Sequence, residues 1–493
     1  MKDLKERTIR GGYARMGALA ANFGLRLGSL MVLARLLNPR DFGLLGMVTA
    51  FTGVLSLFRD FGLSAAAVQL PSVTEEQSST LFWVNLLVGT VLTILAVGCA
   101  PAVSSFYHEP RLLAVTAVVA SGFLFTGAGV QHSAILQREM RFSALAFIDV
   151  ASWLVSVVLA ILAARAGYGY WALVIMSVCQ PLATTVGLWA VTRWIPGRPR
   201  RGVGLASLMR FGGTLTLNSL VVYVASNFDK ILLGRFWGAD ALGIYGRAYQ
   251  IVRIPIDNLN SGAGEVAFAA LSRLQDDPPR LRNYFLKGYS LILALTVPVT
   301  FACGIFASDV VRVLLGAKWG QAVPIFRLLS PTILVFAISN PLGWLLSALG
   351  LVSRGLKIGL VIGPLMIASY FLGLPYGPKG VALAYSAIMV LWAVPGILWC
   401  IHGTIFSFMD ILQVIARPLI AVVPASALAF GVNFLMGHGF PPVARLLAES
   451  ATLSIAYLAL LFFAPGQKSF YFELLRALRA GYSAKDKDLV STP

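Results

Sequence analysis

The sequence predicts an all-α polytopic membrane protein with about 14 transmembrane helices, arranged as two six-helix lobes plus two C-terminal helices. Of its 493 residues, 58% are hydrophobic and only 12% are charged, and the mean hydropathy is +0.79. This is the composition of a chain embedded in lipid and excludes a soluble domain. A helix needs about 20 mostly apolar residues to cross the hydrocarbon of a bilayer. Fourteen stretches of the chain meet that requirement, and an even number of crossings puts both termini on one side.

The predicted helices follow one another with short connections. In chain order they are 13–37, 42–68, 79–104, 111–134, 144–165, 170–194, 209–234, 240–268, 285–308, 321–349, 355–375, 379–402, 411–436 and 441–464. Pro, Gly and several arginines after the sixth helix predict a linker. The predicted domains are an N-lobe at 1–194, a cytoplasmic basic linker at 195–208, a C-lobe at 209–402, helices 13 and 14 at 403–464, and a cytoplasmic basic tail at 465–493.

The distribution of basic residues predicts the orientation. The net charge of +18 would suggest nucleic acid as the partner of a soluble protein, but here the basic residues mostly lie in short loops between apolar stretches. With the N-terminus inside, roughly 22 basic residues fall on the cytoplasmic side and 8 on the other. We therefore predict a multi-pass protein with both termini cytoplasmic and no nucleic-acid partner.

An internal repeat at an offset of 200 residues relates the two lobes. Arg35 pairs with Arg235, and Gly43 and Gly46 pair with Gly243 and Gly246. Because six helices separate the copies, the repeat is parallel about an axis along the membrane normal. Chance agreement of small residues in apolar sequence is the alternative. The paired glycines leave smooth helix surfaces, and we expect tight contacts inside each lobe.

The stretch 227–265 places six ionisable groups inside predicted helices. A charge at mid-membrane costs roughly 2.5 to 3.5 kcal/mol on insertion scales, so it normally faces a water-filled cavity or a partner. Counting helix interiors over the whole chain, bases exceed acids, which predicts a cavity that attracts an anion such as phosphate. The candidate substrate-binding residues are Arg15, Arg26, Arg59, Lys230, Arg247, Gln250, Arg253, Asn260, Arg327 and Asn340.

Within this set, helix 240–268 carries a polar face. Gln250, Arg253, Asp257 and Asn260 recur at spacings of three, four and three residues, which puts them on one side of an α-helix. Pro255 lies among them, lacks an amide hydrogen, and predicts a kink that serves as a hinge. The alternative for Arg253 and Asp257 is an internal ion pair that seals two helices. For Arg15 the alternative is that the side chain only reaches the headgroups.

Buried carboxylates are the groups that exchange a proton or hold sodium. The candidates for ion coupling, with H+ or Na+ as the ion, are Asp60, Asp149, Asp229, Asp257 and Glu265. Permanent pairing with a nearby arginine is the alternative, above all for Asp60 beside Arg59.

Signals of catalysis are lacking in the sequence. There is no P-loop, HExxH or GxSxG motif, so we predict no enzyme, no catalytic residue, no metal site and no cofactor. The four cysteines lie in apolar stretches, and we assign them to packing. The four histidines are scattered near helix ends, where we expect them to be solvated. Thr74 with Glu75, Glu76 and Gln77 is typical of a helix cap and first turn.

Four segments carry a family resemblance, namely FGLSAAAVQ (Phe61–Gln69), TEEQ (Thr74–Gln77), LQREMRF (Leu136–Phe142) and FDKILLGRFWGADALGIYGRAYQI (Phe228–Ile251). The chain resembles the polysaccharide-transporter family of flippases for lipid-linked oligosaccharides, of the O-antigen and exopolysaccharide type, within the superfamily that also holds multidrug exporters. The likeness covers most of the chain and weakens after the twelfth helix. It implies a two-lobe, fourteen-helix exporter in the bacterial inner membrane.

By this resemblance, the expected function is translocation of an undecaprenyl-diphosphate-linked repeat unit across the inner membrane by alternating access, for exopolysaccharide, O-antigen or capsule biosynthesis. The expected partners are the lipid-linked oligosaccharide, membrane lipid, and a polysaccharide polymerase with its assembly machinery; the chain is expected to be a monomer. The alternative is a cation-coupled multidrug exporter on the same fold, which would carry more acid than base in its cavity. A membrane glycosyltransferase would need paired carboxylates near a large outer loop, and the sequence has no such loop.

Overall fold

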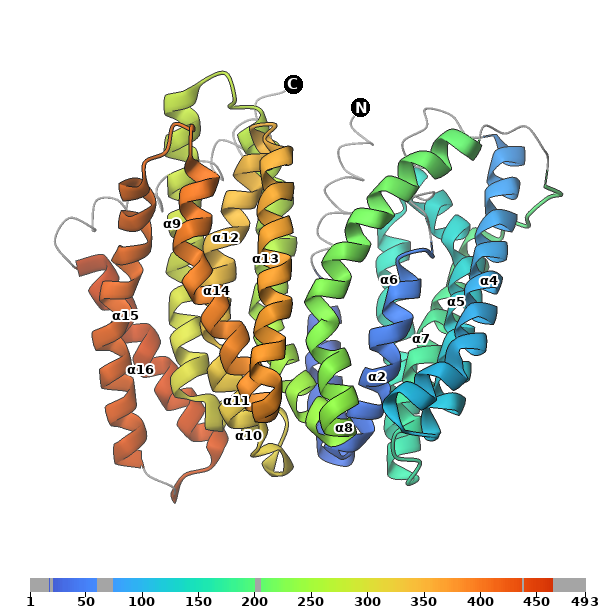
Figure 1. Cartoon of the computed structure of the whole chain (residues 1–493), viewed down its shortest axis with the longest axis horizontal. Coiled ribbons are helices and arrows are strands. Elements are labelled where there is room, and N and C mark those ends of the chain that lie inside the picture. Colours follow the sequence, from blue (N-terminus) through green and yellow to red (C-terminus); the bar gives the residue numbers. More distant parts are fainter. Residues whose placement is uncertain (1–16, 18–20, 60–73, 200–204, 437–438, 464–493) are drawn as a thin grey trace, which may run out of the picture. The chain divides into compact units, whose positions relative to one another are not determined.

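The computed structural model describes residues 17, 21–59, 74–199, 205–436 and 439–463, with the backbone alone for 205–219, 221–222, 259–263 and 265–266. All regular structure in these ranges is helical (Figure 1). The chain divides into two compact units. Unit 1 comprises 1–246, 314–319 and 374–378, and unit 2 comprises 247–313, 320–373 and 379–493. The lobe boundaries given above remain a prediction.

Unit 1 is a bundle whose helices match the predicted spans closely. It contains a helix at 21–36, α2 (Pro39–Ser56), α4 (Glu75–Tyr107), α5 (Arg111–Arg138), α6 (Phe142–Arg165), α7 (Trp171–Thr192) and the first part of α8 (Leu205–Ser272). The cap predicted at the start of α4 is confirmed, because the Thr74 hydroxyl accepts a hydrogen bond from the Gln77 amide. Helix α2 ends at Ser56, and the end predicted for it at residue 68 lies outside the described residues.

Unit 2 holds the rest of α8 and the later helices. These are α9 (Pro278–Ile305), α10 (Ala307–Leu314), α11 (Ala322–Leu329), α12 (Pro331–Ala348), α13 (Val352–Gly373), α14 (Gly377–Ile401), α15 (Phe408–Met436) and α16 (Pro442–Phe463), with short 3-10 turns at Ala317–Trp319 and Leu374–Tyr376. The unit has a continuous apolar core from α9, α12 and α15. Tyr289 on α9 is buried in it and donates its hydroxyl proton to the Ile338 carbonyl of α12 at 3.0 Å.

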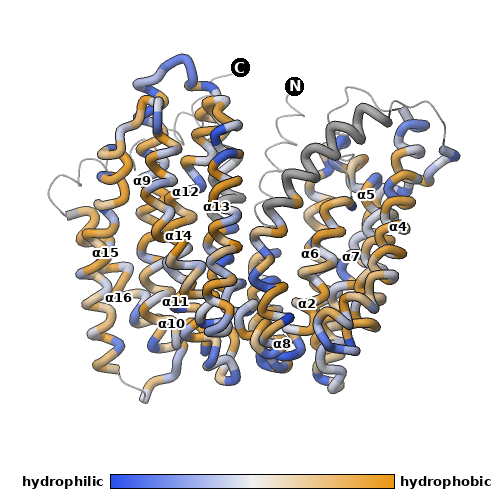
Figure 2. Tube along the Cα trace, viewed as in Figure 1, coloured by the Kyte–Doolittle hydropathy of each residue, from blue (hydrophilic) through white to orange (hydrophobic). Residues whose placement is uncertain are grey.

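Apolar residues run along the bodies of the helices, and polar residues gather at their ends and connections (Figure 2). Nine helical stretches of the described chain are long and apolar enough to cross a membrane. One of these, Val352–Ile401, contains two helices end to end. The all-helical class is therefore confirmed, while the number of fourteen crossings stays a prediction.

Helix α8 contains two helices, as the sequence predicts, but they meet more abruptly than expected. The predicted turn covered 234–240, whereas only Gly238 departs from helical geometry, with φ of 78° and ψ of −175°. A residue with a Cβ atom rarely adopts this conformation, and glycine does so without steric cost. Asp229 and Tyr245 lie on opposite sides of this break, and the Tyr245 hydroxyl donates to the Asp229 carboxylate at 2.7 Å. The chain thus reverses at one residue.

The paired glycines correct one expectation. A Cβ atom on Gly43 would lie 1.7 Å from the Ala239 carbonyl oxygen, and one on Gly243 would lie 1.9 Å from that of Pro39. The offset of 200 residues relates Pro39 to Ala239 as it relates Gly43 to Gly243. Each glycine therefore contacts the residue that corresponds to the other glycine's partner. The start of α2 therefore crosses the later part of α8 within unit 1. The expectation that each glycine pair packs inside its own lobe is wrong, because the glycine faces of the two copies meet each other.

Candidate functional site

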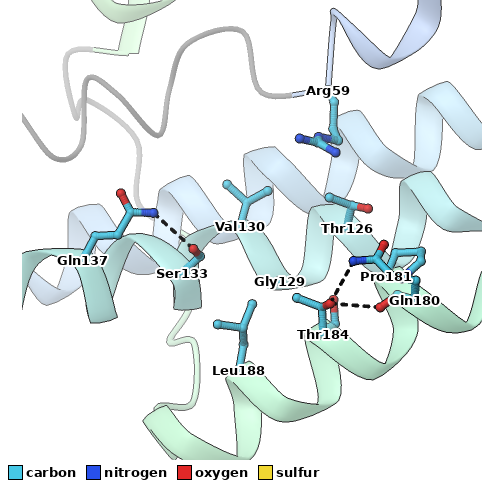
Figure 3. Close-up of a pocket in the computed structure, with 11 residues that line it drawn as sticks. Arg59, Thr126, Gly129, Val130, Ser133, Gln137, Gln180, Pro181, Thr184 and Leu188 are labelled. Carbon is cyan, nitrogen blue, oxygen red and sulfur yellow. Dashed lines mark hydrogen bonds between the residues drawn. The ribbon is translucent and has the colours of Figure 1, made fainter. Parts of the chain in front are cut away.

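A polar cavity of about 270 Å³ lies in unit 1 between α5 and α7. Arg59, in the turn that follows α2, reaches over it (Figure 3). The rest of the lining comes from the last three turns of α5 and from the second half of α7. The guanidinium of Arg59 thus lies at a cavity between two membrane helices.

Hydroxyl and amide side chains supply most of the polar lining. They are Thr126, Ser133, Gln137, Gln180, Thr184 and Thr185. Most of the threonine hydroxyl protons are already used inside the protein, since Thr126 donates to the Gly122 carbonyl at 2.7 Å and Thr185 to the Phe125 carbonyl at 2.7 Å. Their oxygens keep lone pairs that accept from a ligand, while the Gln137 and Gln180 amides supply both donors and acceptors. A polyhydroxylated ligand matches such a lining.

The cation at the mouth of this cavity adds anion affinity. A guanidinium group binds phosphate oxygens through two parallel hydrogen bonds, and charge-assisted bonds of this kind are roughly twice as strong as neutral ones. Arg59 was predicted as a substrate residue, and it is the charged residue that lines this cavity. The combination of one guanidinium with six uncharged polar side chains suits a ligand that has an anionic part and a sugar part.

Arg26 and Asp149 form a second polar group in unit 1. The Arg26 guanidinium lies over the Trp153 ring, 5.1 Å from its centroid, and its charge acts on the carboxylate of Asp149. Asp149 and Trp153 are one turn apart on α6. A cation over an aromatic face is attracted by the ring quadrupole. Arg26 thus binds α6 through both its charge and its stacking contact.

Two of the predicted residues, Asp229 and Lys230, lie in α8 before the break at Gly238 and form hydrogen bonds there. Both carboxylate oxygens of the buried Asp229 accept hydrogen bonds, one from the Tyr245 hydroxyl and the other from the Lys230 amide at 2.8 Å. The Lys230 ammonium donates to the Asn227 side chain at 2.7 Å. The bond from Tyr245 connects the two sides of the Gly238 turn, which favours a structural role for Asp229.

In unit 2, the polar face predicted on α8 contains an ion pair. Arg253 and Asp257 are 2.8 Å apart, both are more than a third exposed, and Arg253 also lies 5.9 Å from the centroid of the Phe336 ring. Arg247 bonds Gln250 one turn earlier. The ion pair is therefore real, and its exposure leaves it accessible. Pro255 keeps helical backbone angles, so its predicted role as a hinge remains a prediction.

The structure says less about the remaining predicted residues. Arg327 is exposed on α11, and its Nε donates to the Gly304 carbonyl at 3.1 Å. Asn340 is half-buried on α12. Arg15 and Asp60 lie outside the described residues, and Asn260 and Glu265 are described by their backbone alone.

The polar lining of the unit 1 cavity was missed by a search that counted charges. A signal was present, because Thr126, Ser133 and Gln137 are spaced seven and four residues apart on α5, and Gln180 and Thr184 are four apart on α7. These spacings put each set on one helix face. Uncharged polar residues at helical spacing in an apolar helix would have located the cavity.

His132 corrects a second expectation. It is fully buried on α5 and not solvated. Its ring packs among Trp189, Trp194 and Phe82, with centroid distances of 4.4, 5.2 and 5.9 Å. Neither ring nitrogen has a hydrogen-bond partner in the structure. The aromatic side chains come from α4, α7 and the segment after α7. Their positions in the sequence therefore do not indicate that they meet around His132.

Comparison with known proteins identifies the family. Residues 32–324, more than half of the chain, match the family model described as polysaccharide biosynthesis protein. The teichuronic acid biosynthesis protein TuaB of Bacillus subtilis (strain 168) is 29% identical over 82% of this chain and 84% of its own length. The lipopolysaccharide biosynthesis protein WzxC of Escherichia coli (strain K12) is 25% identical over 79% and 80%. The resemblance stated from the sequence is confirmed.

The fold has a close relative of known structure. An inward closed conformation of the lipid II flippase MurJ superposes with a TM-score of 0.72, at 14% identity, over 92% of this chain and 99% of that one. At this identity the likeness shows the fold. Family and fold are those of membrane transporters and not of enzymes, in agreement with the sequence.

Proposed function

Because the chain belongs to the family of polysaccharide biosynthesis proteins, we propose that it is a flippase for a lipid-linked oligosaccharide. The proposed cargo is an undecaprenyl-diphosphate-linked repeat unit, which crosses the bacterial inner membrane by alternating access for exopolysaccharide, O-antigen or capsule synthesis. The observation that carries the proposal is the unit 1 cavity, where one guanidinium meets a lining of hydroxyl and amide groups. That chemistry fits a diphosphate joined to sugars.

The proposed roles follow from the chemistry of each group. Arg59 binds the diphosphate, because guanidinium and phosphate pair through two hydrogen bonds. Gln137, Gln180 and Thr184 bind sugar hydroxyls. Arg26, Arg253 and Arg327 are proposed to supply further positive charge along the path of the anion.

The driving ion is proposed to be H+ or Na+. Asp149 and Asp257 are the described candidates that are both exposed and close to an arginine. Exchange of a cation at either site would alter the pairing of that arginine and with it the charge offered to the cargo. The proposed surroundings are membrane lipid and the polymerase with its assembly machinery, with the chain acting as a monomer.

A multidrug exporter is the weaker candidate. A cavity for cationic drugs needs carboxylates, whereas the described lining of this cavity contains Arg59 and no acidic residue. The curated relatives are also proteins of polysaccharide biosynthesis by name. We therefore keep the oligosaccharide flippase as the proposal.

The test measures which leaflet holds the labelled lipid-linked glycan in cells that lack this protein and in cells that regain it. Exposure on the outer leaflet should appear only when the protein is restored. An Arg59→Gln variant should fail to restore it, while Arg312→Gln, which removes an exposed arginine outside the cavity, should restore it fully. Glycan exposure that is independent of the protein would overturn the proposal.

A further inference from the structure

Unit 2 contains a buried group of charges that none of the predicted site residues belongs to. It consists of Asp309 on α10, Arg445 and Glu449 on α16, and Asn433 on α15. The exposed fractions of Asp309, Arg445 and Glu449 are 1%, 5% and 0%. Arg445 pairs with Asp309, and the Asn433 amide donates to Glu449. Arg445 and Glu449 are four residues apart, so they share one face of α16.

The charges of this group do not cancel. Arg445 is ion-paired with Asp309, and the hydrogen-bond donor that the described residues offer to the carboxyl of Glu449 is the neutral amide of Asn433. If all three residues were ionised, the group would bury a net charge of about −1, and an uncompensated buried charge is among the most destabilising features a protein can hold. One bound proton removes that charge.

Two orphaned oxygens give the second, independent observation. Asp309 Oδ2 and Glu449 Oε2 are buried without any hydrogen-bond partner. An ionised carboxylate can only accept hydrogen bonds, whereas a protonated one also donates. A proton on either residue therefore turns one of these orphaned acceptors into a donor.

Among the described residues, no second basic side chain is buried beside Glu449. Helix α16 packs against α15 and α9. Asn433 is the polar contact from α15, Cys303 is the titratable group from α9 that lines the adjacent cavity, and α10 contributes Asp309 together with the exposed Arg312. That adjacent cavity, of about 450 Å³, is lined by Val310, Leu446 and Ser450, the chain neighbours of the three charged residues. Of these neighbours Arg312 is the one that carries positive charge, and its side chain is exposed and not buried beside Glu449.

From these observations we infer that Asp309, Arg445, Glu449 and Asn433 form a proton-binding site of unit 2, with the proton carried by Glu449. Release of the proton leaves an unpaired negative charge between α10 and α16, which weakens their packing. The site therefore couples the packing of α10 on α16 to pH. This inference does not depend on what the protein transports.

The test is the melting temperature of the purified full-length protein between about pH 5 and about pH 9, a range that includes documented titrations of buried glutamates. The wild type should lose about 5 °C or more as the pH rises and Glu449 is forced to ionise. Glu449→Gln, which copies the protonated form, should give a flatter profile and lie close to the wild type at the acidic end. Ser450→Ala is the matched control on the same turn and should follow the wild type throughout.

A second variant keeps the test decisive if Glu449→Gln does not fold. Asp309→Asn leaves Arg445 to neutralise Glu449 without a proton, and it should also flatten the profile. Infrared spectra of the wild type should show a protonated carboxyl band near neutral pH that both variants lack. If Glu449→Gln follows the wild-type profile, or the wild type lacks that band, the proton-binding site is refuted.

Discussion

The two units use their polar residues differently. In unit 1, the described ion pairs Arg40–Glu109, Arg111–Glu109 and Arg141–Glu139 lie at helix ends, and the cavity is lined by uncharged polar groups and Arg59. In unit 2, Arg253–Asp257 lies within α8 and Arg445–Asp309 is buried between α10 and α16, while Arg282–Asp410 joins the starts of α9 and α15. Paired charges in a helix neutralise each other, whereas hydroxyls and amides around a cavity remain able to bond a ligand. The difference directs the search for contacts with the sugars to the unit 1 cavity and for a buried titrating group to unit 2.

The largest effect on stability is expected where α2 crosses α8 in unit 1. Gly43→Ala places a Cβ atom on the Ala239 carbonyl, so the helices must separate, and overpacking of this kind costs about 1–3 kcal/mol or more. Gly246→Ala meets nothing within 4 Å and should be neutral or stabilising by about 0.5–1 kcal/mol. Thermal unfolding of the two purified variants compares them. Equal melting temperatures would show that the helices do not approach closely at Gly43.

A smaller effect, on transport alone, is expected in the unit 1 cavity. The double variant Gln180→Leu with Thr184→Val removes hydrogen-bonding groups that face the cavity, and each lost bond is worth about 1 kcal/mol. We therefore expect roughly 10-fold slower glycan translocation with a nearly unchanged melting temperature. Ser450→Ala with Ser454→Ala, in the apolar cavity of unit 2, is the control and should leave the rate alone. If both double variants slowed translocation to a similar extent, the unit 1 cavity would not be distinguished from the unit 2 cavity as the site that binds cargo.

The pair Arg282–Asp410 of unit 2 should contribute modestly to stability. Two hydrogen bonds, of 2.6 and 3.3 Å, connect the guanidinium on α9 to the carboxylate at the start of α15. Because Arg282 is partly exposed, a coupling of up to about 1 kcal/mol is expected. A double-mutant cycle with Arg282→Gln and Asp410→Asn measures it. A coupling near zero would mean that the two helix ends are held by their apolar contacts alone.

The smallest effect is expected at Arg253–Asp257, also in unit 2. The pair is a half-exposed i,i+4 contact, for which about 0.3–0.5 kcal/mol is typical. Asp257→Asn should therefore hardly change the melting temperature, and exchanging the two residues should restore what is lost. A melting temperature lowered by several degrees in Asp257→Asn would contradict this small contribution. The ion coupling proposed for Asp257 has a separate readout, which is loss of the response of transport to pH and sodium gradients in the same variant.

The sequence predicted the helices well because their signals are local. Apolar length, the cap at Thr74 and the glycine at 238 each act within a few residues. The 200-residue repeat singled out Gly43 and Gly243, which make close contacts, but also Gly246, which meets nothing within 4 Å, and it did not predict that Gly43 and Gly243 face each other's helices. Such a contact depends on how distant helices cross, which one sequence does not state.

The candidate site was predicted less completely, for a physical reason. Arg59 was recognised by its charge, but Gln180 and Thr184 were not, because their value depends on facing Arg59 across a cavity. Glu449 was passed over for a similar reason. Arg445, four residues earlier, is a local signal, but Asp309 and Asn433 come from other helices, so the sequence around Glu449 does not indicate that it is buried.

Arg59 in unit 1 is proposed to bind the anionic group of a lipid-linked cargo. The most direct measurement is the rate at which purified protein in liposomes moves a fluorescent lipid-linked diphosphate oligosaccharide, comparing the wild type, Arg59→Gln and Arg312→Gln. We expect a rate about 10- to 100-fold lower for Arg59→Gln, since a charge-assisted hydrogen bond is worth about 1.5–3 kcal/mol, and an unchanged rate for Arg312→Gln. Equal rates for all three proteins would contradict it.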